Sequence, residues 1–127
     1  MIEIGNNYTR EEIAKELGGS AIEYLPRVGG RVVCACLGLD LNPDAPNTIL
    51  AGFGPQIEES ASLLCEQDDP IPVFIKQHTN AWKYIGNFGV ERGSTEPKEI
   101  KTQEARSGRT GRDGVSRIIY MKEAQTK

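Results

Sequence analysis

The stretch AWKYIGNFGVE, at residues 81–91, limits the folds open to this chain more than any other. Its side chains alternate with the two-residue period of a strand that has one buried face. Trp82 and Tyr84 share a side, and the alternation slips near Gly86, which indicates a β-bulge. Similar strand-length apolar runs stand at 31–37, 70–77 and 115–123. The sequence therefore predicts a β-rich domain.

Two helices are expected beside these strands. The first runs over residues 10–17, because Thr9 and Glu12 have the spacing of a capping box and Gly18 supplies a stop. Ile13 faces the core, and the charged side chains of this helix are expected in solvent. A second helix, or else an extended coil, is expected within PQIEESASLLCEQ, with Pro55 suited to its entry.

The remaining segments are predicted to be loops. DLNPDAPN, at 40–47, has two prolines and four Asn or Asp side chains, and extended chain resumes after it. Residues 92–115 are polar, charged and rich in glycine, which predicts a long basic loop with at most one helical turn at 98–104. We expect residues 1–127 to form one domain.

Composition narrows the class of protein. A chain of 127 residues with 38% hydrophobic and 26% charged residues suits a single globular core and is too small for a two-lobed nucleotide motor. Three cysteines, an odd number, fit a reducing compartment. With no membrane-length apolar run and no signal-peptide pattern at the start, a cytoplasmic location is expected.

Charge is distributed unevenly along the chain. The first 70 residues contain 4 basic and 12 acidic side chains, whereas residues 71–127 contain 11 basic and 6 acidic ones. This asymmetry is consistent with a basic working face on an acidic body, because a local positive field attracts phosphate even when net charge is negative. A solvated dipolar surface without a partner is the alternative.

The segment EARSGRTGRDGVSR looks like the arginine-finger motif of a DEAD-box helicase. No G-x-x-x-x-G-K-[ST] loop accompanies it, so chance similarity explains the match better. Guanidinium groups nevertheless suit phosphate, and glycines allow close approach of the backbone. We predict DNA-backbone contacts from this segment and from two lysines: Arg106, Arg109, Arg112, Arg117, Lys76 and Lys83. A solvated loop without a ligand is the alternative.

The residues give no support for a catalytic or metal site. Cys34 and Cys36, with Cys65 and His78, have the right chemistry for zinc, but alternate cysteines on an apolar strand are more often core residues. His78 is the only histidine, and neither G-x-S-x-G nor H-E-x-x-H is present. We predict no catalytic residue, metal or cofactor.

The aromatic strand suggests a binding site instead. Trp82 and Tyr84, close to Asn80 and Asn87, combine stacking planes with amide hydrogen bonds, as a flipped base requires. Core packing explains the two aromatic residues equally well.

Three segments together resemble the SRA/YDG-like branch of the PUA superfamily. They are IGNNYTREEIAKELGGS, GGRVVCACLGLDLNPDAPNTILAGFGPQ and PIPVFIKQHTNAWKYIGNFGVE, the last similar to the family pattern pVrV......yrYdGlY.V. The likeness covers roughly residues 2–91. It implies an α+β fold, a curved, mostly antiparallel β-barrel with flanking helices, which binds modified DNA by flipping the modified base into a pocket.

The resemblance also implies site residues and partners. The loop LDLNPDAPN occupies the place where the family holds the base, which makes Asp40, Asn42 and Asp44 candidates for its hydrogen-bonding edge. The family's GGYeDD is absent, a departure that a base such as N6-methyladenine, or another ligand, would explain. Such domains often accompany HNH-type nucleases in modification-dependent restriction, so a fused or associated nuclease is implied as a partner.

The sequence thus favours a non-catalytic DNA-binding domain that recognises a modified base. Two alternatives stay open. One is a small PUA-like enzyme acting on nucleic acid or nucleotide, and the other is a protein-interaction module.

Overall fold

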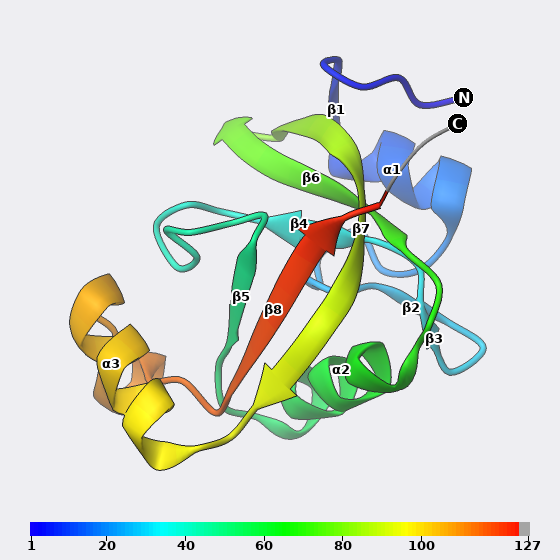
Figure 1. Ribbon diagram of the computed structural model, residues 1–127. Coiled ribbons are helices and arrows are strands. Elements are labelled where there is room, and N and C mark those ends of the chain that lie inside the picture. The colour runs from blue at the N-terminus through cyan, green and yellow to red at the C-terminus, as the bar shows by residue number, and fades with distance from the viewer. Residues whose placement is uncertain (125–127) are drawn as a thin grey trace.

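Six strands form one curled sheet in the computed structural model, which describes residues 1–124 (Figure 1). The order along the sheet is β4 (Ala35–Leu37), β6 (Ile71–His78), β7 (Ala81–Ser94), β8 (Arg117–Glu123) and β5 (Thr48–Ala51), and β1 (Asn7–Tyr8) also pairs with β7. All these pairs are antiparallel except that of β4 with β6. The strands expected from the later apolar runs are confirmed. The run at 31–37 is split between β4 and the separate strand β3 (Arg31–Val32).

β7 gives the sheet its curvature. It is 14 residues long and pairs with β6 along its first half and with β8 along its second half, so the sheet curls around it. Register shifts interrupt both pairings, and such irregularities increase local bending. The result is a curved α+β half-barrel with three α-helices in the described part of the chain, which confirms the predicted fold class.

The bulge predicted near Gly86 is present and reverses the two faces of β7. Ile85 is the extra residue opposite β6, and Gly86 takes a positive φ of 129°. Before the bulge, Tyr84 packs into one core cluster, and beyond it Phe88 packs into another. Since a one-residue insertion moves every later side chain to the opposite face, these even-numbered aromatic residues lie on different sides of the sheet.

α1 (Arg10–Leu17) begins and ends where the sequence predicts. Thr9 accepts from the backbone of Glu12, the Glu12 carboxylate accepts in return, and Gly18 follows the last helical residue. Ile13 is buried as expected. The expectation that all charged side chains of the helix are solvated is wrong for Arg10, because its guanidinium is buried against three backbone carbonyls of residues 20–23.

α2 (Pro55–Glu66) covers the inner side of the sheet. It starts at Pro55 as predicted, and its buried Ala61 and Leu64 join the largest core cluster. A two-stranded hairpin, β2 (Arg27–Val28) with β3, packs next to it. The turn consists of Gly29 and Gly30, whose positive φ angles suit a tight hairpin.

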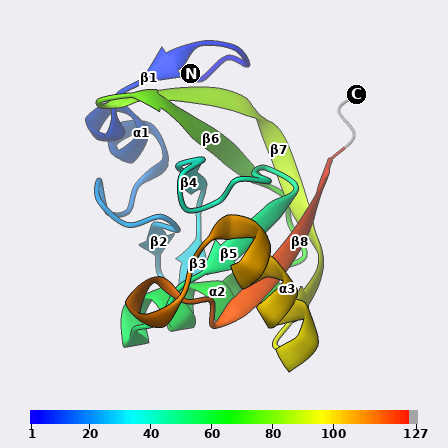
Figure 2. The same ribbon diagram turned by 90° about the vertical axis from the view of Figure 1, so that its left-hand side faces the viewer.

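Residues 92–115 do not form the predicted long loop. β7 continues to Ser94, and the chain then forms α3 (Pro97–Ser107) and the short 3-10 turn η1 (Gly111–Asp113). Glu96 caps the start of α3, and Gly108 ends it in the left-handed conformation. α3 lies against β5 and β8 (Figure 2). None of its side chains is fully buried, although Ile100 packs partly against the cluster of Leu50, Val115 and Ile118. Hydrophobic periodicity, the main helix signal, is therefore weak in this segment.

Candidate binding cavity at the edge of β5

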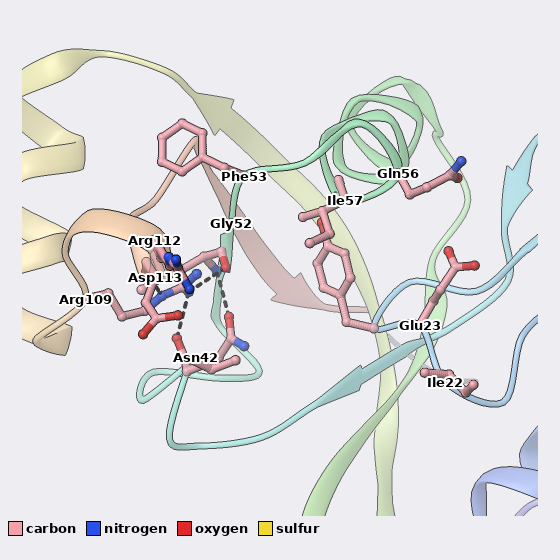
Figure 3. Close-up of a pocket in the computed structure, with 13 residues that line it drawn as sticks. Ile22, Glu23, Asn42, Gly52, Phe53, Gln56, Ile57, Arg109, Arg112 and Asp113 are labelled. Atoms are coloured by element: carbon pink, nitrogen blue, oxygen red, sulfur yellow. Dashed lines mark hydrogen bonds between the residues drawn. The ribbon is translucent and has the colours of Figure 1, made fainter.

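A cavity of about 430 Å³ opens beside the edge strand β5 (Figure 3). Its walls come from segments far apart in the sequence: the chain before β2, the loop after β4, the end of β5 with the two residues after it, the start of α2, and η1 with Arg109 just before it. A volume of this size is within the range of small-molecule sites. The lining consists of Ile22, Glu23, Tyr24, Leu41, Asn42, Leu50, Gly52, Phe53, Gln56, Ile57, Arg109, Arg112 and Asp113.

Apolar and aromatic side chains form much of this cavity. Phe53 is 55% exposed and Ile22 is 87% exposed, and Leu41 and Ile57 also leave large parts of their side chains in solvent. Tyr24 donates its hydroxyl to the carbonyl of Ile57 at 2.7 Å, and burial raises its pKa. Exposed apolar residues gathered at one hollow are a mark of a binding surface.

Arg109 belongs to the cavity wall and not to a phosphate-binding surface. Its guanidinium is buried and donates to the carbonyls of Asp113 at 2.7 Å, Leu50 at 2.8 Å, Leu41 at 3.0 Å and Gly114 at 3.3 Å. Desolvation lowers the pKa of this arginine. The predicted contact of Arg109 with the DNA backbone is thus at odds with the structure, because its donors already bind the protein's own carbonyls.

The other arginines of the helicase-like segment differ in their surroundings. Arg106 makes two hydrogen bonds to the carboxylate of Asp44, at 2.7 and 2.9 Å, which lower the pKa of Asp44. Arg112 is exposed at the cavity and has no ion-pair partner among residues 1–124. Arg117 is half-buried at the start of β8, next to Cys65. Of the four, Arg112 is therefore best placed to meet a ligand in the cavity.

Most of the predicted base pocket lies elsewhere. Tyr84 is buried in the cluster beneath α1, and its hydroxyl donates to Asn87 at 2.6 Å. Trp82 packs against the same cluster, with the Arg10 guanidinium 5.2 Å and the Lys76 ammonium 5.6 Å from its ring centre. Neither aromatic residue lines the cavity. The bulge at Gly86 separates this face from the inner core.

Asn80 and Lys83 also lie outside the cavity lining. Asn80 forms the tight turn between β6 and β7 with a positive φ of 49°, accepts from the backbone of Arg10 and donates to Glu11. Lys83 and Lys76 are exposed on β7 and β6.

The loop at 40–47 contributes one residue of the predicted set directly. Asn42 is buried and lines the cavity, whereas Asp40 is exposed and accepts from the backbone of Leu41. Asp44 does not line the cavity but anchors the loop to α3 through Arg106. The structure thus brings together Asn42, Arg109 and Arg112 from the predicted residues.

The cysteines do not form a metal site. No group of three or more metal-ligating side chains exists within the described residues. Cys34 and Cys36 are buried in the cluster beneath α1, and Cys65 is half-buried. The hydrogen bond with the neighbouring Cys36 thiol, together with burial, raises the pKa of Cys34.

Sequence reasoning missed the aromatic residues of the cavity. Tyr24 stands in the irregular segment before β2, and Phe53 stands between two glycines after β5. The motif GFG could have indicated Phe53, because the flanking glycines have no side chains to cover the aromatic ring. Nothing in the local sequence distinguishes Tyr24.

Within residues 1–124, no helix combines the length and apolar character needed to cross a membrane.

A search of curated proteins found no significant match. Among solved structures, the chain is similar to the SRA domain of SUVH5 in its complex with hemi-methylated CG DNA. The TM-score is 0.61 at 14% identity, and the alignment covers 99% of this chain and 91% of the other. Residues 7–124 match a model described as Domain of unknown function (DUF6697), and the chain therefore belongs to that family.

Proposed function

We propose that this domain binds DNA and recognises one modified base, which it accommodates in the cavity beside β5. The observation that carries the proposal is the cavity itself, because it joins aromatic side chains to hydrogen-bonding groups in one hollow. Extruded bases are held by stacking on aromatic planes and by hydrogen bonds to their edges. Phe53 and Tyr24 provide the aromatic surfaces, and Asn42 provides an amide.

The fold supports the same proposal. A domain of the same architecture is known in complex with hemi-methylated DNA, and the shared fold covers nearly the whole of this chain. The base would enter at the β5 edge and not at the Trp82 and Tyr84 face, because Tyr84 is buried in a closed cluster. Arg112, exposed at the cavity, would meet the phosphate beside the extruded base.

A binding panel tests this function. The pure domain should bind duplexes that contain 5-methylcytosine, 5-hydroxymethylcytosine or N6-methyladenine, and bind one of them more tightly than the unmodified duplex. Phe53→Ala should reduce that preference by about 5-fold to 150-fold, since stacking of one base on an aromatic ring contributes about 1–3 kcal/mol. Because Phe53 is largely exposed, the variant should unfold at nearly the wild-type denaturant concentration.

Trp82→Ala is the matched variant, because the sequence predicts this large aromatic residue in the pocket whereas the structure packs it against the cluster beneath α1. It should lower stability but leave the preference for modified DNA unchanged in the folded fraction. The proposal fails if no modified duplex is preferred. It also fails if Trp82→Ala, and not Phe53→Ala, removes the preference.

The role in modification-dependent restriction stays a prediction. A domain of this kind would supply specificity to a fused or associated nuclease. The isolated chain should therefore leave every duplex of the panel uncut, with or without added Mg²⁺. Cleavage by the pure chain would favour the enzyme alternative.

A further inference from the structure

The side chain of Asn42, in the cavity wall, caps an unpaired backbone group of the edge strand β5. β5 is the last strand of its sheet, so its outward backbone groups have no neighbouring strand. The side-chain oxygen of Asn42 accepts from the backbone N–H of Leu50, on β5, at 2.7 Å. Arg109 donates to the carbonyl of the same residue at 2.8 Å. Both outward groups of Leu50 are thus satisfied by side chains, as a buried edge requires.

This contact fixes which end of the carboxamide faces the ligand. Only Oδ1 of an asparagine accepts hydrogen bonds, so Nδ2, with its two N–H groups, must point away from Leu50. Figure 3 shows the amide nitrogen of Asn42 on the side of the open cavity. Nδ2 makes no hydrogen bond to any residue in the described range 1–124. Asn42 as a residue is 5% exposed, yet Nδ2 is not among the fully buried polar atoms that lack a partner, so this donor keeps contact with the solvent of the cavity.

The amide is also held in place by the backbone around it. The N–H of Asn42 donates to Gly38 at 3.0 Å, and its carbonyl accepts from Ala45 at 3.1 Å. Arg109 bonds to the carbonyl of the preceding residue, Leu41, as well as to β5. The donor is therefore oriented before a ligand arrives, which reduces the entropy lost on binding.

We propose that Asn42 determines which bases the cavity accepts, by presenting a fixed hydrogen-bond donor. The bound base must place an acceptor, a ring nitrogen or a carbonyl oxygen, against Nδ2. This inference rests on the proposed function and adds to it the direction of the hydrogen bond: the protein donates and the base accepts. A base with no acceptor at that position would displace the water from Nδ2 and leave this donor unpaired, and sites of this kind reject such ligands strongly.

The variant Asn42→Asp tests the proposed contact with the base separately from the hydrogen bond that caps Leu50. One carboxylate oxygen still accepts from Leu50, so β5 keeps its cap, while the other oxygen turns the cavity donor into an acceptor. Asn47→Asp is the matched control, because it adds the same charge to the same loop at an exposed residue outside the cavity lining. General repulsion of DNA by the added charge affects both variants.

The measurement is equilibrium binding of the best duplex from the modified-base panel, and of analogues in which each acceptor of the modified base is removed in turn. Replacement of N3 of a cytosine, or of N1 of an adenine, by C–H is one such change. We expect one removal to weaken wild-type and Asn47→Asp binding by about 5-fold to 150-fold. The same removal should leave Asn42→Asp binding nearly unchanged.

The outcomes separate the two proposals. A wild-type protein that prefers no modified duplex overturns the proposed function. A wild-type protein that prefers one, yet loses no affinity on any acceptor removal, overturns the inference alone, whether or not Asn42→Asp folds. Equal losses in wild type and Asn42→Asp also overturn it, because Asn42 would then serve only as an edge cap.

Discussion

Arg109 and Arg112 lie three positions apart in the segment SGRTGRDG, yet the first side chain is buried and the second is exposed. Arg109 is buried and binds four carbonyls from the loop after β4, from β5 and from η1. Arg112 remains exposed at the cavity. The likeness of this segment to an arginine finger comes from its spacing of arginine and glycine. Here Gly108 and Gly111 allow the positive φ angles of 76° and 60° that turn the chain from α3 into η1.

Lysine in place of arginine tests these different roles. Arg109→Lys should lower the free energy of unfolding by about 2–4 kcal/mol, because a single ammonium cannot reach all the carbonyls that the guanidinium fork satisfies. Arg112→Lys, the same exchange at an exposed position, should change it by less than about 0.5 kcal/mol. Urea unfolding of both variants is the measurement. Equal effects would contradict the structural role of Arg109.

At the scale of elements, α3 is fixed mainly by polar contacts, with Ile100 as its one apolar residue packed against a core cluster. Near its start, Glu99 accepts hydrogen bonds from Arg92 at 2.8 Å, Ser94 at 2.7 Å and Tyr120 at 3.0 Å. Near its end, Arg106 binds Asp44, and the Glu104 carboxylate accepts from the backbone of Val115. α3 is therefore tied to β7, to β8 and to the loop at 40–47, and through that loop to the cavity wall.

Acid should weaken this attachment within a definite range. The contacts from Arg92, Ser94 and Tyr120 hold the pKa of Glu99 at about 2, below its ordinary value of 4.5. A carboxylate with a lowered folded-state pKa stabilises the native state fully above the unfolded-state pKa, and this contribution is lost as the pH falls through the folded-state value. The stability difference between wild type and Glu99→Gln should thus be constant above about pH 5 and shrink between about pH 4.5 and 2.

Thermal unfolding of both proteins across that range is the measurement. Glu59→Gln is a suitable control, because it removes a carboxylate from an exposed ion pair, with Arg27, outside α3. A difference between wild type and Glu99→Gln that does not vary with pH would contradict the role of the Glu99 carboxylate.

Sequence reasoning succeeded for α1, α2 and the long strands because local signals agree there. Caps, proline entry and two-residue alternation stand in the residues themselves. It failed for α3, whose helix-forming composition and caps are not accompanied by an apolar stripe. It also failed for the pair Trp82 and Tyr84, because alternation places them on a common face without indicating whether that face is a pocket or a core.

At the scale of the whole molecule, most of the arginines already bind other groups of the protein. The chain has 8 arginines, of which Arg10 and Arg109 are buried. Four others form ion pairs with carboxylates: Arg27, Arg31, Arg92 and Arg106. Within the described residues, Arg112 and Arg117 are the arginines with neither arrangement. Among the arginines, Arg112 and Arg117 are consequently the ones open to phosphate, beside the exposed Lys76 and Lys83.

Each phosphate contact contributes about 0.9 to the slope of log affinity against log salt concentration. Arg112→Gln should therefore reduce the magnitude of that slope by about 0.9 when binding is measured between roughly 50 and 200 mM salt. Lys15→Gln, on α1 and outside the cavity lining, should leave the slope unchanged. An unchanged slope in Arg112→Gln would remove this residue from the DNA contact.

The sequence by itself determined the long strands, two of the helices and the bulge, since each depends on residues adjacent in the chain, and the fold class followed from the resemblance of three segments to a known family. Only the tertiary structure decided where the cavity lies and which side chains line it. The reason is geometric: Tyr24, Asn42, Phe53 and Arg109 come from segments with no local relation to one another, and the curl of the sheet around β7 brings them to the same edge.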